Sequence, residues 1–184
     1  MSANPDTPGA EDVLRFWFET HREDWFVKRA AFDDEIRARF QSLHESAAAG
    51  LLDAWRESPR SCLALVIVLD QFPRNLYRDS ARAFATDPQA REAARVILAR
   101  GWDRPMSESE RLFAYLPFEH SESLEDQERS CALMKDFDPK LRDYAERHRD
   151  IIRRFGRFPH RNGLLGREST AAELEFLKMP GSRF

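Results

Sequence analysis

Three short motifs of this sequence combine the residue types that carry out acid–base and anion-binding chemistry. They are residues 70–75 (DQFPRN), residues 116–122 (LPFEHSE) and residues 157–163 (RFPHRNG). Imidazole moves protons near neutral pH, carboxylates accept them, and the planar guanidinium group of arginine holds carboxylates and phosphates by paired hydrogen bonds. These residue types indicate a polar site for a small anion, provided that the fold brings the motifs together.

The first motif places a carboxylate where an apolar side chain is expected. Asp70 continues the apolar face of the preceding helix at helical spacing, so we expect it to be buried. A buried carboxylate needs a cation or several hydrogen-bond donors nearby, and Arg74 or Arg78 could supply the charge. Pro73 disfavours helical backbone at Phe72, so the helix is predicted to end there. Taken alone, this motif favours a structural ion pair over a functional carboxylate.

The second motif sets an imidazole, His120, between the carboxylates of Glu119 and Glu122. It is predicted to lie in the connection between two helices, because Pro117 should end the helix before it. Such a cluster could orient a general base or supply part of a metal site, although two ligands on one loop do not define such a site. The alternative, equally supported, is that the carboxylates cap the next helix and that His120 is an ordinary polar loop residue.

The third motif lies in a locally basic stretch, residues 148–168, which contains six arginines but two acidic residues. Arg157 and Arg161 are suited to a carboxylate or phosphate ligand. His148 falls on the apolar stripe of the preceding helix, where a histidine is more often a hydrogen-bonded core residue than a ligand. This stretch therefore adds candidate anion-binding groups to those of the first two motifs.

All three motifs are predicted at or just beyond helix ends, and helix ends on one side of an antiparallel bundle can converge. We therefore predict that Arg74, His120, His160 and Arg161 line a single cavity at one end of the helical array. Charged groups in such number are costly to bury without water, so water or a ligand should reach them.

The elements that must position these motifs are helical. Start and stop signals divide the chain into about eight helices packed as antiparallel hairpins, and no segment alternates apolar and polar residues as a strand would. Capping boxes begin at Ser107 and Thr170, and Thr7-Pro8 is predicted to open the first helix. Residues 62–69 are apolar on every side, which predicts a central buried helix. The predicted helices start near residues 8, 30, 59, 87, 107, 123, 139 and 170. The sixth is predicted to span residues 123–137.

The composition limits the classes of protein to which this chain can belong. The 184 residues, 42% apolar and 33% charged, suffice for one all-helical domain over residues 1–184 with a sizeable core. The formal charge of −3 and the pI near 6.0 mean that the chain has no overall positive charge that would indicate binding to nucleic acid or to membranes. The longest apolar run has eight residues, the N-terminus lacks the features of a secretory signal, and the two cysteines form no disulfide or zinc pattern. We expect a soluble, cytoplasmic protein.

The same motifs resemble those of the bacterial "domain of unknown function 924" family. The resemblance rests on the polar motifs and on aromatic and C-terminal segments: residues 16–18 (FWF), 25–26 (WF), 32–33 (FD), 70–75, 116–122 with Gln127, His148, 155–162, 165–167 (LGR) and 173–177 (ELEFL). It extends over nearly the whole chain. It implies an all-α array of tetratricopeptide-like helical hairpins, and it implies no established activity.

Two functions from different classes follow from this sequence. The first is a polar pocket that binds, or also turns over, a small anionic ligand; the second is a protein–protein interaction scaffold, by analogy with tetratricopeptide arrays alone. RNA binding through the arginine-rich stretch is disfavoured by the acidic net charge. The candidate catalytic residues are His120, His160 and Glu122. The candidate binding residues are Asp70, Gln71, Arg74, Asn75, Glu119, His120, Glu122, Gln127, His148, Arg157, His160, Arg161 and Asn162.

We expect no cofactor, and we expect metal binding to be weak or absent, because no set of ligands closes a coordination sphere at a recognisable spacing. Protein purified without an affinity tag should therefore contain zinc, iron and manganese well below one ion per chain when measured by elemental analysis. A stoichiometric amount of any of these metals would contradict this expectation.

Overall fold

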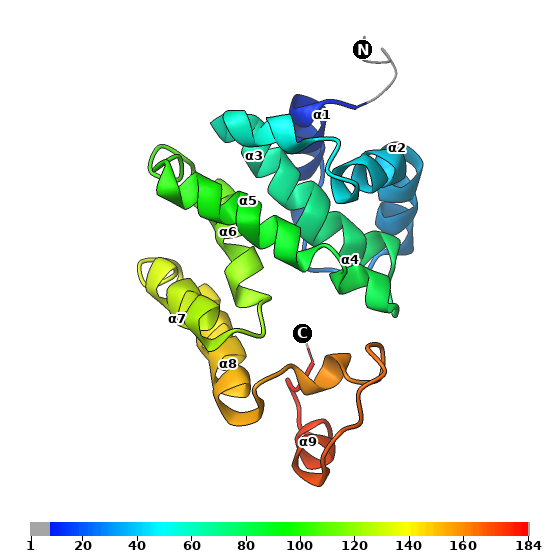
Figure 1. Cartoon of the computed structure of the whole chain (residues 1–184), viewed down its shortest axis with the longest axis vertical. Coiled ribbons are helices and arrows are strands. Elements are labelled where there is room, and N and C mark those ends of the chain that lie inside the picture. The colour runs from blue at the N-terminus through cyan, green and yellow to red at the C-terminus, as the bar shows by residue number, and fades with distance from the viewer. Residues whose placement is uncertain (1–7, 184) are drawn as a thin grey trace. The chain divides into compact units, whose positions relative to one another are not determined.

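The computed structural model of the chain describes residues 8–183, and each regular element in that range is a helix (Figure 1). The all-α prediction is confirmed. The described residues form two compact units. The first unit extends up to Arg78 and continues over Arg82–Pro117, and the second contains Asp79–Ala81 and the residues from Phe118 onward. That one domain spans the chain stays a prediction, and so does the tetratricopeptide-like array.

The first unit is built around one buried helix. Its helices are α1 (Ala10–Arg15), α2 (Ala30–Ala48), α3 (Pro59–Val66), α4 (Phe72–Leu76), α5 (Asp87–Ala99) and most of α6 (Glu108–Glu119). α3 packs against α1 and α5, and α2 packs against α4 (Figure 1). Residues 62–69 are each at most 1% exposed, which confirms the prediction of a central helix that is buried on every side.

Aromatic side chains fill the space between these helices. Trp17 lies edge-on to Phe113 with 5.3 Å between the ring centroids, and Phe40 packs on Phe72 at 5.0 Å. All four side chains are completely buried. Burial of one phenylalanine side chain contributes roughly 1.5–3 kcal/mol, so this cluster supplies a large share of the stability of the first unit.

The second unit has a smaller apolar core. Its helices are α7 (Leu124–Leu133), α8 (Pro139–Phe155) and α9 (Ala171–Phe176), and α7 packs against α8 (Figure 1). Ile151, Ile152 and Phe158 form the apolar centre, and Phe155 and Phe176 pack against them. Many of the other buried side chains in this unit are polar, so their hydrogen bonds decide how the unit holds together.

Most helix starts agree with the local signals in the sequence. Ser107 and Glu110 exchange the hydrogen bonds of a capping box at 2.8 and 3.3 Å, and Thr170 and Glu173 do so at 2.7 and 3.3 Å. At the start of α8, the Asp138 carboxylate accepts a main-chain hydrogen bond of 2.8 Å. These contacts join residues within one helical turn, which is why the sequence alone predicts them.

The start of α1 and the end of α7 are displaced from the predicted positions. α1 begins at Ala10 with Gly9 as its cap, and Thr7 of the predicted opening lies outside the described residues. α7 ends at Leu133 rather than at Phe137. The chain turns there, because the N–H of Phe137 donates to a carbonyl three residues earlier at 3.0 Å.

Pro73 does not end its helix, contrary to the prediction. α3 continues through a π-helical turn, Ile67–Gln71, into α4, and Phe72 keeps helical dihedral angles (φ −57°, ψ −41°). In this turn the N–H of Phe72 reaches back five residues instead of four, and Pro73 has no N–H to donate. The carbonyls of Val68 and Leu69 therefore lose their usual helical partners.

Side chains from elsewhere in the first unit supply the missing donors. His44 of α2 donates from Nδ1 to the Val68 carbonyl at 3.0 Å, and the Thr86 hydroxyl donates to the Leu69 carbonyl at 2.6 Å. Leaving one such buried carbonyl unpaired would cost about 1–3 kcal/mol. The proline is tolerated inside the helix because the tertiary structure satisfies the backbone that the proline leaves unpaired.

Pro117 lies inside α6, so it does not end that helix either. Glu119 is consequently helical, and residues 120–123 alone form the connection to α7. Leu116 and Phe118, on either side of the proline, are buried. Burial of this last turn offsets the roughly 3 kcal/mol that a proline costs in a helix interior.

Replacing Thr86 by valine removes the hydroxyl that pairs with the Leu69 carbonyl and keeps the shape of the side chain. We expect the free energy of unfolding to fall by about 1–3 kcal/mol, the cost of leaving a buried carbonyl unpaired. Chemical denaturation followed by circular dichroism measures this change. Thr20→Val is the matched control, because the exposed Thr20 hydroxyl makes a long contact of 3.5 Å. Equal losses in the two variants would contradict the role given to Thr86.

Candidate functional site

The first motif forms a buried ion-pair network in the first unit. Asp70 is completely buried, and its Oδ1 lies 3.5 Å from Nη1 of Arg74. The same Nη1 lies 3.0 Å from Oδ1 of Asp87 and also donates to the carbonyl of Asp70. Gln71 donates to Oδ2 of Asp70 at 2.6 Å. Asp70 lies within the π-helical turn and not at a helix end, which corrects the prediction, and its contacts favour the structural interpretation of this motif.

Asn75 and Arg78 bind a different carboxylate, that of Asp33 in α2. Asn75 donates to Asp33 at 2.8 Å, and Arg78 makes a bidentate pair with it at 2.5 and 2.7 Å. Burial raises the pKa of Asp33, but the two donors outweigh burial and leave the pKa below its usual value. The sequence analysis named Asp33 in the family resemblance and not as a candidate site residue. Its position beside the buried Phe32, on the apolar stripe of a helix, is the signal that could have identified it.

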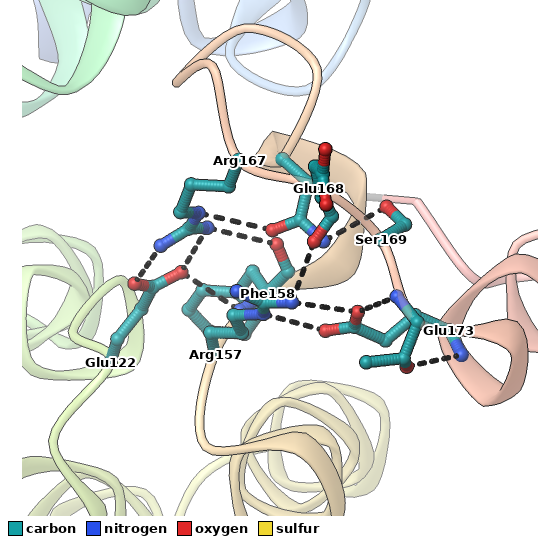
Figure 2. A network of polar contacts seen from close by, with 9 residues as sticks. Glu122, Arg157, Phe158, Arg167, Glu168, Ser169 and Glu173 are labelled. Carbon is teal, nitrogen blue, oxygen red and sulfur yellow. Dashed lines mark hydrogen bonds and ion pairs between the residues drawn. The ribbon is translucent and has the colours of Figure 1, made fainter.

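In the second unit, Glu122 holds the turn that follows α8 (Figure 2). Its carboxylate accepts a bidentate pair from Arg167 at 2.7 and 2.9 Å and the main-chain N–H of Phe158 at 2.8 Å. Burial raises the pKa of Glu122, but these donors outweigh burial and leave the pKa below its usual value. Arg167 also donates from Nε to Asn162 at 3.0 Å. Both oxygens of Glu122 are engaged. Arg167 is a member of this network that the sequence analysis named in the family resemblance and not as a candidate site residue.

A second arginine–carboxylate clamp fixes α9 (Figure 2). Arg157 makes a bidentate pair with Glu173 at 2.6 and 2.8 Å and donates to the carbonyl of Glu168 at 2.9 Å. The hydrogen bond from Arg157 lowers the pKa of Glu173 to about 2. A shallow, open depression of about 440 Å³ beside this clamp is lined by Arg154, Phe155, Arg157, Thr170, Ala172 and Glu173. Because Arg157 is engaged by Glu173, the clamp acts as a structural latch.

Basic side chains gather around the buried ring of Phe158. The guanidinium carbon of Arg161 lies 4.5 Å from the ring centroid, and the His148 and His160 rings lie 5.6 and 5.7 Å from it. Nη1 of Arg161 donates to the carbonyl of His120 at 3.1 Å, which brings the connection after α6 to the same place. Arg161 is 7% exposed, whereas His120 and His160 are half-buried. We call these five residues the Phe158 cluster.

Burial keeps two imidazoles of the Phe158 cluster neutral at neutral pH. The pKa of His148 is lowered to about 3, mainly by burial and further by the neighbouring basic side chains of His120, Arg161 and His160. The pKa of His160 is lowered to about 4, again mainly by burial and next by Arg161. Near pH 7 both rings therefore offer one hydrogen-bond donor and one acceptor and carry no charge.

His148 connects the Phe158 cluster to the end of α6. Its Nδ1 lies 2.8 Å from the carbonyl of Tyr144 and 3.4 Å from Oε1 of Glu119. Gln127 of α7 is completely buried and donates to the carbonyls of Glu119 and Ser121, both at 2.7 Å. Gln127 thus holds the backbone from which Glu119 approaches His148.

The predicted site residues divide between the two units. The second unit contains Glu119, His120, Glu122, Gln127, His148, Arg157, His160, Arg161 and Asn162. The first unit contains Asp70, Gln71, Arg74 and Asn75. In the first unit, Asp70, Gln71 and Arg74 share one network, whereas Asn75 contacts Asp33. In the second unit, His120, His148, His160 and Arg161 gather at Phe158, with Glu119 and Gln127 next to His148. Glu122 and Asn162 contact Arg167, and Arg157 contacts Glu173. That Arg74 lines one cavity with His120, His160 and Arg161 stays a prediction.

Within residues 8–183, no group of three or more histidine, cysteine, aspartate or glutamate side chains is placed to hold a metal ion. Neither cysteine forms a disulfide, and burial raises the pKa of Cys62 to about 11, so this thiol is unreactive near neutral pH. In the same part of the chain, no helix has the length and apolar character needed to cross a membrane.

Replacing Glu173 by glutamine should loosen α9, because it weakens both the clamp with Arg157 and the capping box with Thr170. Amide hydrogen exchange over α9 should become about tenfold faster or more. The unmodified latch should also weaken as the pH falls from 4.5 towards about 2, since the charged carboxylate is the form that the fold stabilises. Glu175→Gln is the matched control, because Glu175 lies on the same helix in an exposed pair with Lys178. Equal exchange rates in the two variants would contradict the latch.

Comparison with known proteins supports the same architecture. The solved structure of a protein of unknown function, ATU0120 from Agrobacterium tumefaciens, is similar to this chain with a TM-score of 0.89 and 47% sequence identity. The similarity covers 92% of this chain and 96% of that one. No protein with a curated description matches the chain. The family described as "bacterial protein of unknown function (DUF924)" matches residues 13–181, and the chain therefore belongs to this family, as the resemblance of its motifs predicted.

Proposed function

We propose that the Phe158 cluster binds a small anion, a carboxylate or a phosphate, and that this binding is the function of the second unit. The observation that carries the proposal is the packing of Arg161, His148 and His160 around one buried ring. A guanidinium group stacked on an aromatic face directs its N–H edge outward in the plane that suits a carboxylate or phosphate oxygen. The neutral imidazoles add hydrogen-bond donors and acceptors without adding charge.

Arg161 lies with the imidazole rings of His148 and His160 around Phe158. Arg157 and Arg167 each form a bidentate pair with a carboxylate, so their charges are offset locally. Beside Arg161, the rings of His148 and His160 are neutral near pH 7, so they add hydrogen-bonding groups, and the attraction for an anion comes from the guanidinium group itself. His120 and His160 are half-buried, and we propose that they form the entrance to the site.

Should the ligand also be turned over, we propose His120 and His160 as the proton carriers. Glu122 was a third candidate in the sequence. Its two oxygens are engaged by Arg167 and by the N–H of Phe158, so we propose that Glu122 positions the cluster and transfers no proton.

Sulfate, phosphate and acetate are the probes for this proposal. Calorimetry and the NMR signals of the histidine rings should show saturable binding that shifts the signals of His148 and His160. Arg161→Gln should weaken binding about tenfold or more, because it removes a charge-assisted hydrogen-bond donor. Arg153→Gln is the matched control, because Arg153 lies on α8 and pairs with Glu128 at the surface. Failure of all three anions to bind, or equal affinity in a folded Arg161→Gln variant, would overturn the proposal.

A second candidate is an interaction scaffold built from tetratricopeptide-like hairpins. Phe26 and Val27, which lie between α1 and α2, favour it because they are 68% and 46% exposed. The preceding Trp25 donates to the carbonyl of Trp17 at 2.8 Å, which holds this segment in place. A partner protein that binds less tightly to Phe26→Ser and equally well to Arg161→Gln would support the scaffold. For either function we propose a cytoplasmic protein with no membrane or nucleic-acid partner, in keeping with its net charge of −3.

A further inference from the structure

We infer that the open depression beside α9 binds a carboxylate that carries an apolar group, and that Arg154 is the side chain that holds the carboxylate group. None of the residues that line the depression belongs to the Phe158 cluster, so the inference goes beyond the proposed function. The depression lies within the second unit, and its volume of about 440 Å³ falls in the roughly 300–1,000 Å³ of pockets that take small ligands.

Arg154 is a cation without a carboxylate partner in the part of the chain that the structure describes. Its guanidinium carbon instead lies 4.7 Å from the ring centroid of Phe155 and 5.9 Å from that of Phe176. The preceding Arg153, by contrast, forms an ion pair of 2.5 Å with Glu128. Arg154 is exposed, so the N–H groups of its planar fork can reach a carboxylate that arrives from solvent.

Two phenylalanine rings hold the guanidinium group of Arg154 in position. The ring centroids of Phe155 and Phe176 lie 5.1 Å apart, and both rings pack against the apolar centre of the unit. An arginine stacked on fixed rings loses less freedom on binding than an arginine that moves freely in solvent. Phe155 also lines the depression, as does Ala172. An apolar group that is joined to the carboxylate therefore has a surface to lie against.

The clamp between Arg157 and Glu173 also lines the depression (Figure 2). Glu173 is 2% exposed, and its two oxygens accept hydrogen bonds from Arg157 and from the main-chain N–H of Thr170. The negative charge of Glu173 therefore offsets that of Arg157 and leaves the charge of Arg154 to attract a ligand. The charged groups that line the depression are two arginines and one glutamate, so an anion is favoured over a neutral or cationic ligand.

The probe for this site is 3-phenylpropanoate, which joins a carboxylate to one aromatic ring. Two-dimensional NMR of the full chain should show saturable shifts of the main-chain amide signals of Phe155 and Ala172. Because the depression is open, we expect a dissociation constant on the order of 1 mM. 3-Phenylpropanamide has the same shape without the charge, and acetate has the charge without the ring. Each should bind at least about tenfold more weakly than 3-phenylpropanoate.

Replacing Arg154 by glutamine tests the assignment of the carboxylate to this side chain. Arg154→Gln should weaken the binding of 3-phenylpropanoate about tenfold or more, because it removes charge-assisted hydrogen bonds. Arg153→Gln is the matched control, because Arg153 lies one residue earlier on α8 and should leave the dissociation constant unchanged. The comparison of 3-phenylpropanoate with 3-phenylpropanamide uses the unmodified protein, so that part of the test does not depend on the folding of a variant.

The same chemical group could belong to a free acid or to the end of a polypeptide, and a second probe distinguishes these sources. The peptide acetyl-Ala-Ala-Phe ends in a carboxylate beside a benzyl side chain. Tighter binding of this peptide than of 3-phenylpropanoate would support a chain terminus as the ligand, and equal or weaker binding would support a free acid. Both results support the inference, because both require saturable binding that Arg154→Gln weakens.

Equal affinity for 3-phenylpropanoate and 3-phenylpropanamide would overturn the inference. Equal affinity for 3-phenylpropanoate in a folded Arg154→Gln variant would also overturn it. So would the absence of saturable shifts at Phe155 and Ala172 at probe concentrations up to about 50 mM.

Two sets of NMR signals separate this inference from the proposed function. The amide signals of Phe155 and Ala172 report on the depression, and the ring signals of His148 and His160 report on the Phe158 cluster. If the ring signals respond to none of sulfate, phosphate and acetate while the amide signals respond to 3-phenylpropanoate, the proposed function is overturned and the inference stands. If the ring signals respond and the amide signals do not, the inference is overturned and the proposed function stands.

Discussion

The packing of the first unit depends on a buried backbone that must find hydrogen-bond donors outside its own helix. The π-helical turn Ile67–Gln71 and Pro73 leave two carbonyls of the central helix without helical partners. His44 of α2 and Thr86, the residue before α5, supply the donors. Each unpaired carbonyl would cost about 1–3 kcal/mol, so packings that move α2 or the start of α5 away from the central helix are disfavoured. Satisfying this backbone therefore determines which segments flank the core.

The second unit has a small apolar centre and depends more on charged contacts. Arg167 and Glu122 are 45 residues apart in sequence, and Arg157 and Glu173 are 16 apart, yet each pair is bidentate. Arginine suits this role because its planar fork matches both oxygens of a carboxylate, which the ammonium group of lysine does not. The two clamps hold the turn that carries Phe158. The geometry of the Phe158 cluster is consequently a product of the contacts that stabilise this unit.

The Phe158 cluster can be buried because the imidazole rings of His148 and His160 are neutral near pH 7. Neutral imidazoles are far less costly to bury than imidazolium ions, and burial holds the pKa values of His148 and His160 at about 3 and about 4. Acid should therefore destabilise the fold. Below about pH 6.5 the histidines of the unfolded chain bind protons, whereas His148 and His160 of the folded chain bind them only when the pH approaches these lower pKa values.

The sequence by itself determined the helical class, the buried central helix and most helix starts. The capping boxes at Ser107 and Thr170 are predictable because their hydrogen bonds close within one helical turn, whatever the rest of the chain does. The three polar motifs were likewise visible as unusual residue types near apolar stretches. Only the tertiary structure decided that Pro73 stays within a helix and that Arg78 pairs with Asp33, 45 residues away in sequence. The physical reason is that a donor or counter-charge can come from any segment that packs nearby, and which segments pack together is a property of the whole core and not of a local window.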